Sequence, residues 1–138
     1  MGFMRVLIVE DDETFRAELI KVFAKIDPEI QVSTAENAEE TIGFMDSQHL
    51  NPNFGYDLII SDVTLNGAAT GFDLWRVCSD RYPSTYFVFM SGISAFEFLE
   101  KLKNEPRCPP FLTKPFVLSQ FKNLIREVLD HKAKFLKD

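Results

Sequence analysis

The chain has 138 residues, and its 15 basic and 21 acidic side chains give a formal net charge of −6. This length supports one domain with its own core, and the acidic balance without a basic run argues against nucleic acid or a membrane surface as a partner. The N-terminal apolar run is too short for a signal peptide, no segment approaches transmembrane length, and Cys78 and Cys108 lack metal or disulfide spacing, so we expect a cytoplasmic protein with free thiols.

The first half of the chain alternates apolar runs with amphipathic segments. Residues 5–9 form a β-branched run typical of a buried strand, and three acids follow it directly. A helix is then predicted up to Pro28, with an apolar stripe at helical spacing formed by Phe15, Leu19, Val22, Phe23 and Ile26. A more polar strand over 30–35 leads into a second helix, which the spacing of Asn37 and Glu40 predicts to begin there.

The second half repeats this alternation three times. Short apolar strands are predicted over 58–60, 85–90 and 111–113, each followed by a helix. The expected inward residues of the last two helices are Ala95, Phe98, Leu99 and Leu102, and then Leu118, Phe121, Ile125 and Val128. Five strand-then-helix units with right-handed crossovers predict an α/β fold, a doubly wound five-stranded parallel sheet with helices on both faces.

Polar groups follow four of the five predicted strands. They are Glu10 with Asp11, then Asp62, Ser91 and Lys114. The carboxyl ends of parallel strands form the ligand crevice of such a sheet, where several carboxylates favour a hard divalent cation such as Mg²⁺. A hydroxyl and an ammonium opposite the metal would bind an anion formed on Asp62, which indicates phosphoryl transfer. Each residue alone has an ordinary explanation, as a cap, a turn residue or a surface charge.

Four motifs carry a resemblance to a known family. VEDD, SDVTL, MSG and TKPF follow the first, third, fourth and fifth predicted strands, and together they resemble the receiver domain of bacterial two-component response regulators. The resemblance runs from about Arg5 to Leu129. It implies the flavodoxin-like strand order 2-1-3-4-5 and a single receiver domain over 1–138, with a core of about 5–129 and a helical extension over 130–138.

The resemblance also implies roles for individual residues. Asp62 would be the phosphoacceptor, and Lys114 and Ser91 would contact the phosphoryl group. The ligands of Mg²⁺ or Mn²⁺ would be Glu10, Asp11, Asp62 and the backbone carbonyl of Thr64. Ser91 and Phe111 would form the switch. Such a domain is a signalling protein rather than an enzyme: a sensor histidine kinase or histidine phosphotransfer protein supplies its phosphoryl group, and it assists its own phosphorylation and dephosphorylation.

The chain departs from the family pattern at four positions. Glu10 stands where Asp is commoner, Ser91 replaces the commoner Thr, and Phe111 has no phenolic hydroxyl. Asn66 stands where the family often has Pro, and the loop that leads to Gly71 is one residue longer. The geometry beyond Thr64 is therefore the part of the site that the resemblance predicts least.

An output surface is predicted from apolar residues that the helical stripes leave unused. Phe96 lies beside charged residues in the fourth helix, and Phe135 lies near the end of the last helix. No output domain follows Leu129 in the sequence, so we expect output through protein contacts. The face formed by the fourth helix, fifth strand and fifth helix would bind an unknown downstream target or a second copy of the chain, giving a homodimer.

Three other functions share parts of this pattern. A haloacid-dehalogenase-type phosphatase also uses strand-end acids, but Glu10 stands where its nucleophilic Asp belongs. A flavodoxin-like FMN carrier has the same fold, yet no Ser/Thr/Gly-rich phosphate loop follows the first strand. A receiver-like protein that binds a partner without being phosphorylated stays open as the third alternative.

Overall fold

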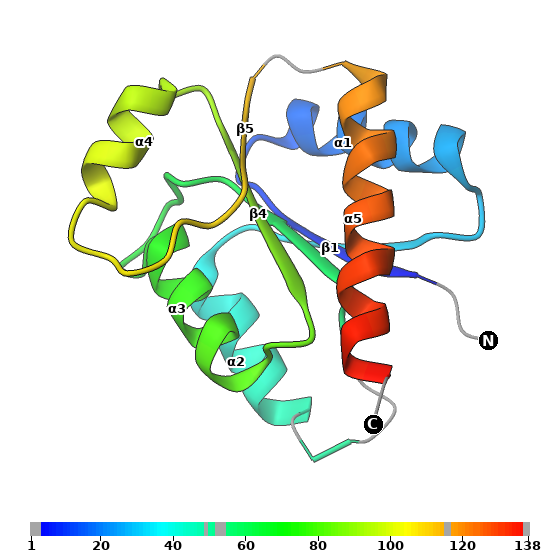
Figure 1. Ribbon diagram of the computed structural model, residues 1–138, viewed down its shortest axis with the longest axis horizontal. Coiled ribbons are helices and arrows are strands. Elements are labelled where there is room, and N and C mark those ends of the chain that lie inside the picture. Colours follow the sequence, from blue (N-terminus) through cyan, green and yellow to red (C-terminus); the bar gives the residue numbers. More distant parts are fainter. Residues whose placement is uncertain (1–3, 49, 52–54, 115–116, 137–138) are drawn as a thin grey trace.

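A central parallel sheet organises the protein (Figure 1). The computed structural model describes residues 4–48, 50–51, 55–114 and 117–136, and for 135 and 136 the backbone alone. In this part of the chain the strands are β1 (Arg5–Val9), β2 (Gln31–Ala35), β3 (Leu58–Ser61), β4 (Tyr86–Ser91) and β5 (Phe111–Thr113). Their order, β2-β1-β3-β4-β5, and their parallel pairing confirm the predicted fold.

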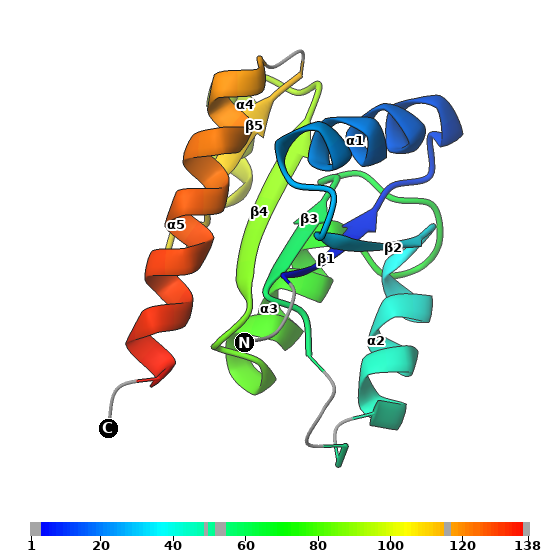
Figure 2. The same cartoon turned by 90° about the vertical axis from the view of Figure 1, so that its right-hand side faces the viewer.

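Helices cover both faces of the sheet (Figures 1 and 2). They are α1 (Glu13–Ile26), α2 (Ala38–Gln48), α3 (Gly71–Arg81), α4 (Ala95–Lys101) and α5 (Leu118–Leu136). Alternate residues of each strand point to opposite faces, so β3 sends Ile59 into the cluster beneath α2, α3 and α4, and Ile60 into the cluster beneath α1 and α5. No helix among the described residues is long and apolar enough to span a membrane.

Side-chain caps fix where the helices begin. Asp12 Oδ1 accepts a hydrogen bond from Phe15 N (3.1 Å), and Asn37 Oδ1 accepts one from Glu40 N (2.8 Å), as its spacing predicted. Thr70 and Asp73 form a reciprocal capping box at the start of α3. These caps start the helices at the carboxyl ends of the strands, next to the predicted site.

The predicted inward faces of the last two helices need correction. In α4, Phe98 and Leu102 are buried, but Ala95 is exposed and the Leu99 side chain is 55% exposed. This helix has only seven residues, and within it Phe98 is the one buried residue, so a short helix presents little of the predicted stripe to the core. In α5 the buried row is Phe121, Leu124 and Val128, whereas Leu118, predicted inward, is 45% exposed in the first turn.

The end of α5 packs closer to the sheet than the predicted extension implies. His131 Nε2 lies 2.9 Å from the carbonyl oxygen of Pro83, and its ring packs edge-on against Tyr86. Lys132 pairs with Asp57 at 3.1 Å, just before β3. Packing against the body of the domain therefore continues past the predicted core limit at residue 129.

The two cysteines are expected to react at very different rates. Cys78 is buried in α3, and burial raises the pKa of its thiol to about 12, whereas Cys108 is exposed. Because the thiolate is the nucleophile, Ellman's reagent at mildly alkaline pH should modify Cys108 quickly and Cys78 only after unfolding. The variant Cys108→Ser should show no fast reaction, and fast labelling of that variant would contradict the buried placement of Cys78.

Candidate functional site at the strand ends

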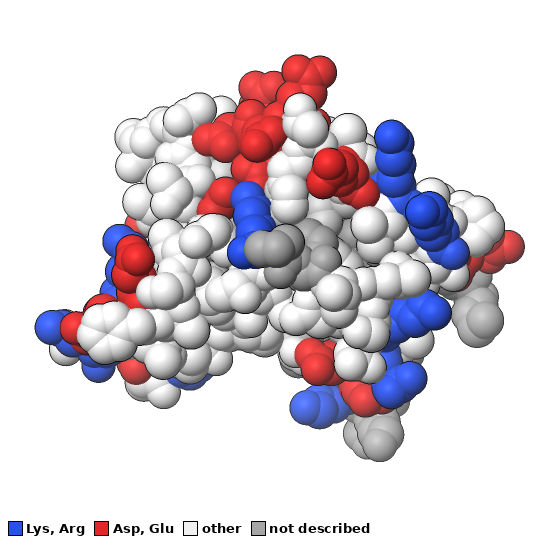
Figure 3. Space-filling model, turned by 90° about the horizontal axis from the view of Figure 1, so that it is seen from above, with Lys and Arg blue, Asp and Glu red and all other residues white. Residues whose placement is uncertain are grey.

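The sheet brings three of the predicted site residues into direct contact. Lys114 Nζ lies 2.8 Å from Glu10 Oε1 and 3.2 Å from Asp62 Oδ2. These side chains follow β5, β1 and β3, which are far apart in sequence. The strand order places β1 beside β3, and β5 one strand further along, beyond β4. Acidic side chains gather on the face of the molecule seen in Figure 3. The site is thus an acidic strand-end crevice with one ammonium bonded to two carboxylates.

Burial and neighbouring charges shift the pKa values of Glu10 and Lys114, in a cluster that holds more negative than positive charge. The Glu10 side chain is only 3% exposed, and burial raises the pKa of its carboxyl; Lys114 opposes this rise, and the charge of Asp62 adds to it. Burial works against the charge of Lys114, but its bonds to Glu10 and Asp62 outweigh burial and raise its pKa. Two carboxylates therefore share one positive charge.

Both oxygens of the Asp62 carboxylate have hydrogen-bond donors. Thr64 N donates to Oδ1 at 3.2 Å, while Lys114 binds Oδ2. The backbone is held as well, because Asp62 N donates to the carbonyl oxygen of Val9 at 3.1 Å. A Cβ atom at Gly71 would collide with the Asp62 carbonyl oxygen, so the close start of α3 requires glycine there.

Asp11 lies on the other side of this cluster and has a different partner. Its Oδ2 accepts a hydrogen bond from Asn66 N at 3.3 Å. No group of three or more His, Cys, Asp or Glu side chains in the described part of the chain lies in metal-binding arrangement. The donors nevertheless suit Mg²⁺, because the carboxylates of Glu10, Asp11 and Asp62 are hard oxygen ligands whose charge Lys114 balances only in part.

Ser91 and Phe111 lie at the ends of the neighbouring strands. Ser91 is buried, its hydroxyl accepts a hydrogen bond from Ile93 N at 3.4 Å, and its carbonyl oxygen accepts one from Lys114 N at 2.9 Å. Phe111 is half-buried and stacks on Phe98 of α4, with ring centroids 4.1 Å apart and planes at 15°. The proposed switch aromatic is therefore in contact with α4.

Two site residues were missed by the sequence reasoning. The Lys114 ammonium lies over the Phe15 ring, 3.9 Å from its centroid, and Arg16 Nη1 donates to the carbonyl oxygen of Glu10 at 2.7 Å. Phe15 was assigned to the apolar stripe of α1, and Arg16 was not among the predicted site residues. The only sequence signal was their position one turn after the acids, which does not reveal what a side chain contacts.

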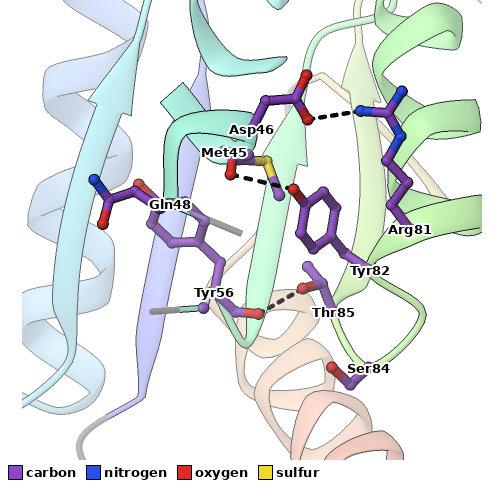
Figure 4. Close-up of a pocket in the computed structure, with 9 residues that line it drawn as sticks. Met45, Asp46, Gln48, Tyr56, Arg81, Tyr82, Ser84 and Thr85 are labelled. Atoms are coloured by element: carbon purple, nitrogen blue, oxygen red, sulfur yellow. Dashed lines mark hydrogen bonds and ion pairs between the residues drawn. The ribbon is translucent and has the colours of Figure 1, made fainter. Parts of the chain in front are cut away.

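A pocket of about 680 Å³ lies between α2 and α3 near the opposite ends of the strands (Figure 4). Polar contacts cross it: Arg81 pairs with Asp46 at 2.6 Å, and the Tyr82 hydroxyl donates to the Met45 carbonyl oxygen at 3.2 Å. These groups bind each other and tie α3 to α2. We assign this pocket a structural role.

Comparisons with known proteins agree with this fold. The family model of the response regulator receiver domain matches residues 6–126. The sensory transduction protein LytT of Bacillus subtilis is 28% identical over 134 residues, which are 92% of this chain and 52% of LytT. The chain thus spans about half the length of this curated relative.

Solved structures resemble the chain over nearly its whole length. The receiver domain of an HD domain-containing protein from Pseudomonas fluorescens has a TM-score of 0.79 at 21% identity, covering 97% of this chain and 92% of that one. The chemotaxis response regulator CheY4 of Vibrio cholerae has a TM-score of 0.69 at 22% identity, covering 92% and 99%. These likenesses concern the fold.

With most of its length matched by the family model, the chain belongs to the response regulator receiver domains. It is a signalling domain of two-component phosphorelays rather than a classical enzyme.

Lys114→Ala is expected to destabilise the protein by leaving Glu10 buried beside Asp62 without a counter-charge. Breaking a buried ion pair costs about 3 to 5 kcal/mol, and because Lys114 is partly exposed we expect a loss of about 2 kcal/mol in unfolding free energy at neutral pH. The raised pKa of Glu10 means that lowering the pH toward 4.5 protonates it first in the folded state, so the loss should shrink in acid.

Urea unfolding of the wild type and Lys114→Ala at neutral pH and at about pH 5 measures both effects. Adding Glu10→Gln to Lys114→Ala removes the unpaired charge and should recover most of the lost stability. An equal loss at both pH values, with no recovery in the double variant, would contradict this account of the cluster.

Proposed function

We propose that Asp62 is the phosphoacceptor of this receiver domain and that a histidine kinase or histidine phosphotransfer protein is its donor. The observation that carries the proposal is the contact of Lys114 Nζ with Asp62 Oδ2 at the crevice edge of the sheet. Glu10 also binds the ammonium and a backbone N–H of its own loop, but Asp62 follows the central strand β3, and its side chain is 13% exposed against 3% for Glu10.

The chemistry is a transfer from nitrogen to oxygen. A carboxylate oxygen of Asp62 attacks phosphorus, the O–P bond forms, the N–P bond of the donor phosphohistidine breaks, and the imidazole nitrogen keeps the electron pair. After the transfer, Lys114 donates to the phosphoryl group in place of a carboxylate oxygen. The Ser91 hydroxyl is a second donor to that group. The same residues position the acyl phosphate for its later hydrolysis.

Mg²⁺ completes the charge balance of the site in this proposal. Its ligands would come from Glu10, Asp11, Asp62 and the Thr64 carbonyl, with Mn²⁺ as a substitute. When bound, the ion neutralises negative charge on the carboxylates and on the incoming phosphoryl group. The surplus of carboxylates over Lys114 supports this role.

Asp62→Asn is expected to abolish phosphorylation. With Mg²⁺ and a small phosphodonor, the wild type should gain one phosphoryl group that is stable in acid and labile in base, as an acyl phosphate is. A chelator should prevent labelling. Intact mass spectrometry measures the label, and Asp57→Asn, which changes an acid just before the same strand, is the matched control. Labelling of Asp62→Asn equal to the control would contradict the assignment, and no labelling of the wild type would favour a receiver that is not phosphorylated.

The output surface that we propose includes the exposed side of α4. The Phe96 side chain is 73% exposed and Leu99 is 55% exposed, so the helix presents two large apolar groups among charged neighbours. On the inner side, Phe98 stacks on Phe111 and contacts Phe89 of β4 at a centroid distance of 5.6 Å. A displacement of Ser91 at the end of β4 is thus passed to α4 through the contacts of these three rings. The Phe135 side chain, the other predicted contact, lies outside the described residues.

Phosphorylation is expected to strengthen contacts made by this surface. If the surface binds a second copy, the beryllofluoride-loaded protein should show a larger average mass by light scattering than the unloaded protein. Replacing Phe96 and Leu99 by Ala should remove that difference, because it removes the apolar anchors. Phe44→Ala is the control, since Phe44 is a 50% exposed aromatic on α2. An unchanged mass in all states would rule out the homodimer and leave a different protein as the target.

A further inference from the structure

The loop between β3 and α3 is held by carboxylates on two sides. Asp11 Oδ2 accepts a hydrogen bond from Asn66 N at 3.3 Å, and Glu39 Oε1, from the first turn of α2, accepts one from Ala69 N at 2.6 Å. The stretch 66–68 between these two points is exposed. The loop therefore depends on these contacts, rather than on burial, for the position of its outer part.

Gly67 lies between Asn66 and Ala69, the two residues whose N–H groups are bound. Its φ angle of 112° is one that residues with a Cβ rarely adopt, and a Cβ built there would collide with the Glu39 carboxylate. Glu39 thus packs against the loop at Gly67 while it binds the amide of Ala69.

The hydrogen bond from Asn66 N holds the carboxylate of Asp11, one of the proposed Mg²⁺ ligands. The hydrogen bond occupies one carboxylate oxygen of Asp11 and restricts rotation of the carboxylate, which leaves the other oxygen free to bind an ion. Such contacts to a ligating carboxylate orient it and change the affinity for the metal. The residue at 66 can donate because it is not proline, which has no N–H. The departure from the family pattern at this position therefore supplies a hydrogen bond that proline could not make.

We propose that Glu39 is a positioning residue for the metal ligand Asp11. By holding Ala69 and packing against Gly67, it fixes the loop so that the Asn66 N–H meets the Asp11 carboxylate. Its hydrogen bond is charge-assisted and short, which makes it the stronger of the two contacts. The inference rests on the proposed binding of Mg²⁺ at Asp11 and deepens it.

Three variants distinguish this positioning role from the general effect of removing a negative charge near the metal site. Glu39→Ala removes both the charge and the acceptor, Glu39→Gln removes the charge but keeps a carbonyl oxygen for Ala69 N–H, and Glu40→Ala removes a charge from the same exposed turn of α2. Calorimetric titration with MgCl₂ measures affinity without phosphorylation. Direct outer contacts of a metal ligand change affinity about 10- to 100-fold, so for this contact one step further out we expect Glu39→Ala to raise Kd about 5-fold. Glu39→Gln and Glu40→Ala should each have a Kd for Mg²⁺ within about 2-fold of the wild-type value.

Amide hydrogen exchange without metal supplies the second readout. In Glu39→Ala, both Ala69 and Asn66 amides should exchange faster, whereas Glu39→Gln should keep their protection. Faster exchange confined to Ala69, or a Kd equal to that of Glu40→Ala, would overturn the role of Glu39. If the wild type does not bind Mg²⁺, or Asp11→Asn binds it equally well, the proposed metal site itself fails, which is a distinct result.

Discussion

The arrangement of this protein's site depends on one shared positive charge. Lys114 follows the edge strand β5 and reaches Glu10 after β1 and Asp62 after β3, so one ammonium links three strand ends. The ring of Phe15 lies against this ammonium and restricts its position. Two acids with one counter-charge leave the site with a net negative charge, so it still attracts cations.

Aromatic packing connects the strand ends near this charge cluster to α4. Phe89, Phe98 and Phe111 come from β4, α4 and β5, and the Phe98 ring packs against the other two. Ser91 ends the same strand that carries Phe89. Close-packed interiors transmit displacement rather than absorb it, so a shift of this strand end reaches α4 through a few contacts.

The loop after Asp62 shows how the chain accommodates its departures from the family pattern. An asparagine at position 66, where the family often has proline, would be expected to loosen the segment. Instead, Asp11 and Glu39 each bind a backbone N–H of this loop, and Gly67 supplies the conformation that lets both bonds form. Polar contacts from two neighbouring elements thus replace the rigidity that a proline would have provided.

The sequence by itself determined the strand and helix order, the start of the second helix at Asn37, and the polar strand ends, because these follow from local periodicity, from capping spacing and from the chirality of parallel crossovers. It could not determine the rotation of the short α4, where Leu99 proved exposed, nor the partners of Asp11, Glu39 and Phe15. Those contacts join residues 30 to 99 positions apart, as in Glu39 with Ala69 and Phe15 with Lys114. Only the tertiary structure decides them, because side-chain contacts between distant elements depend on how strands and helices pack, and no local pattern records that.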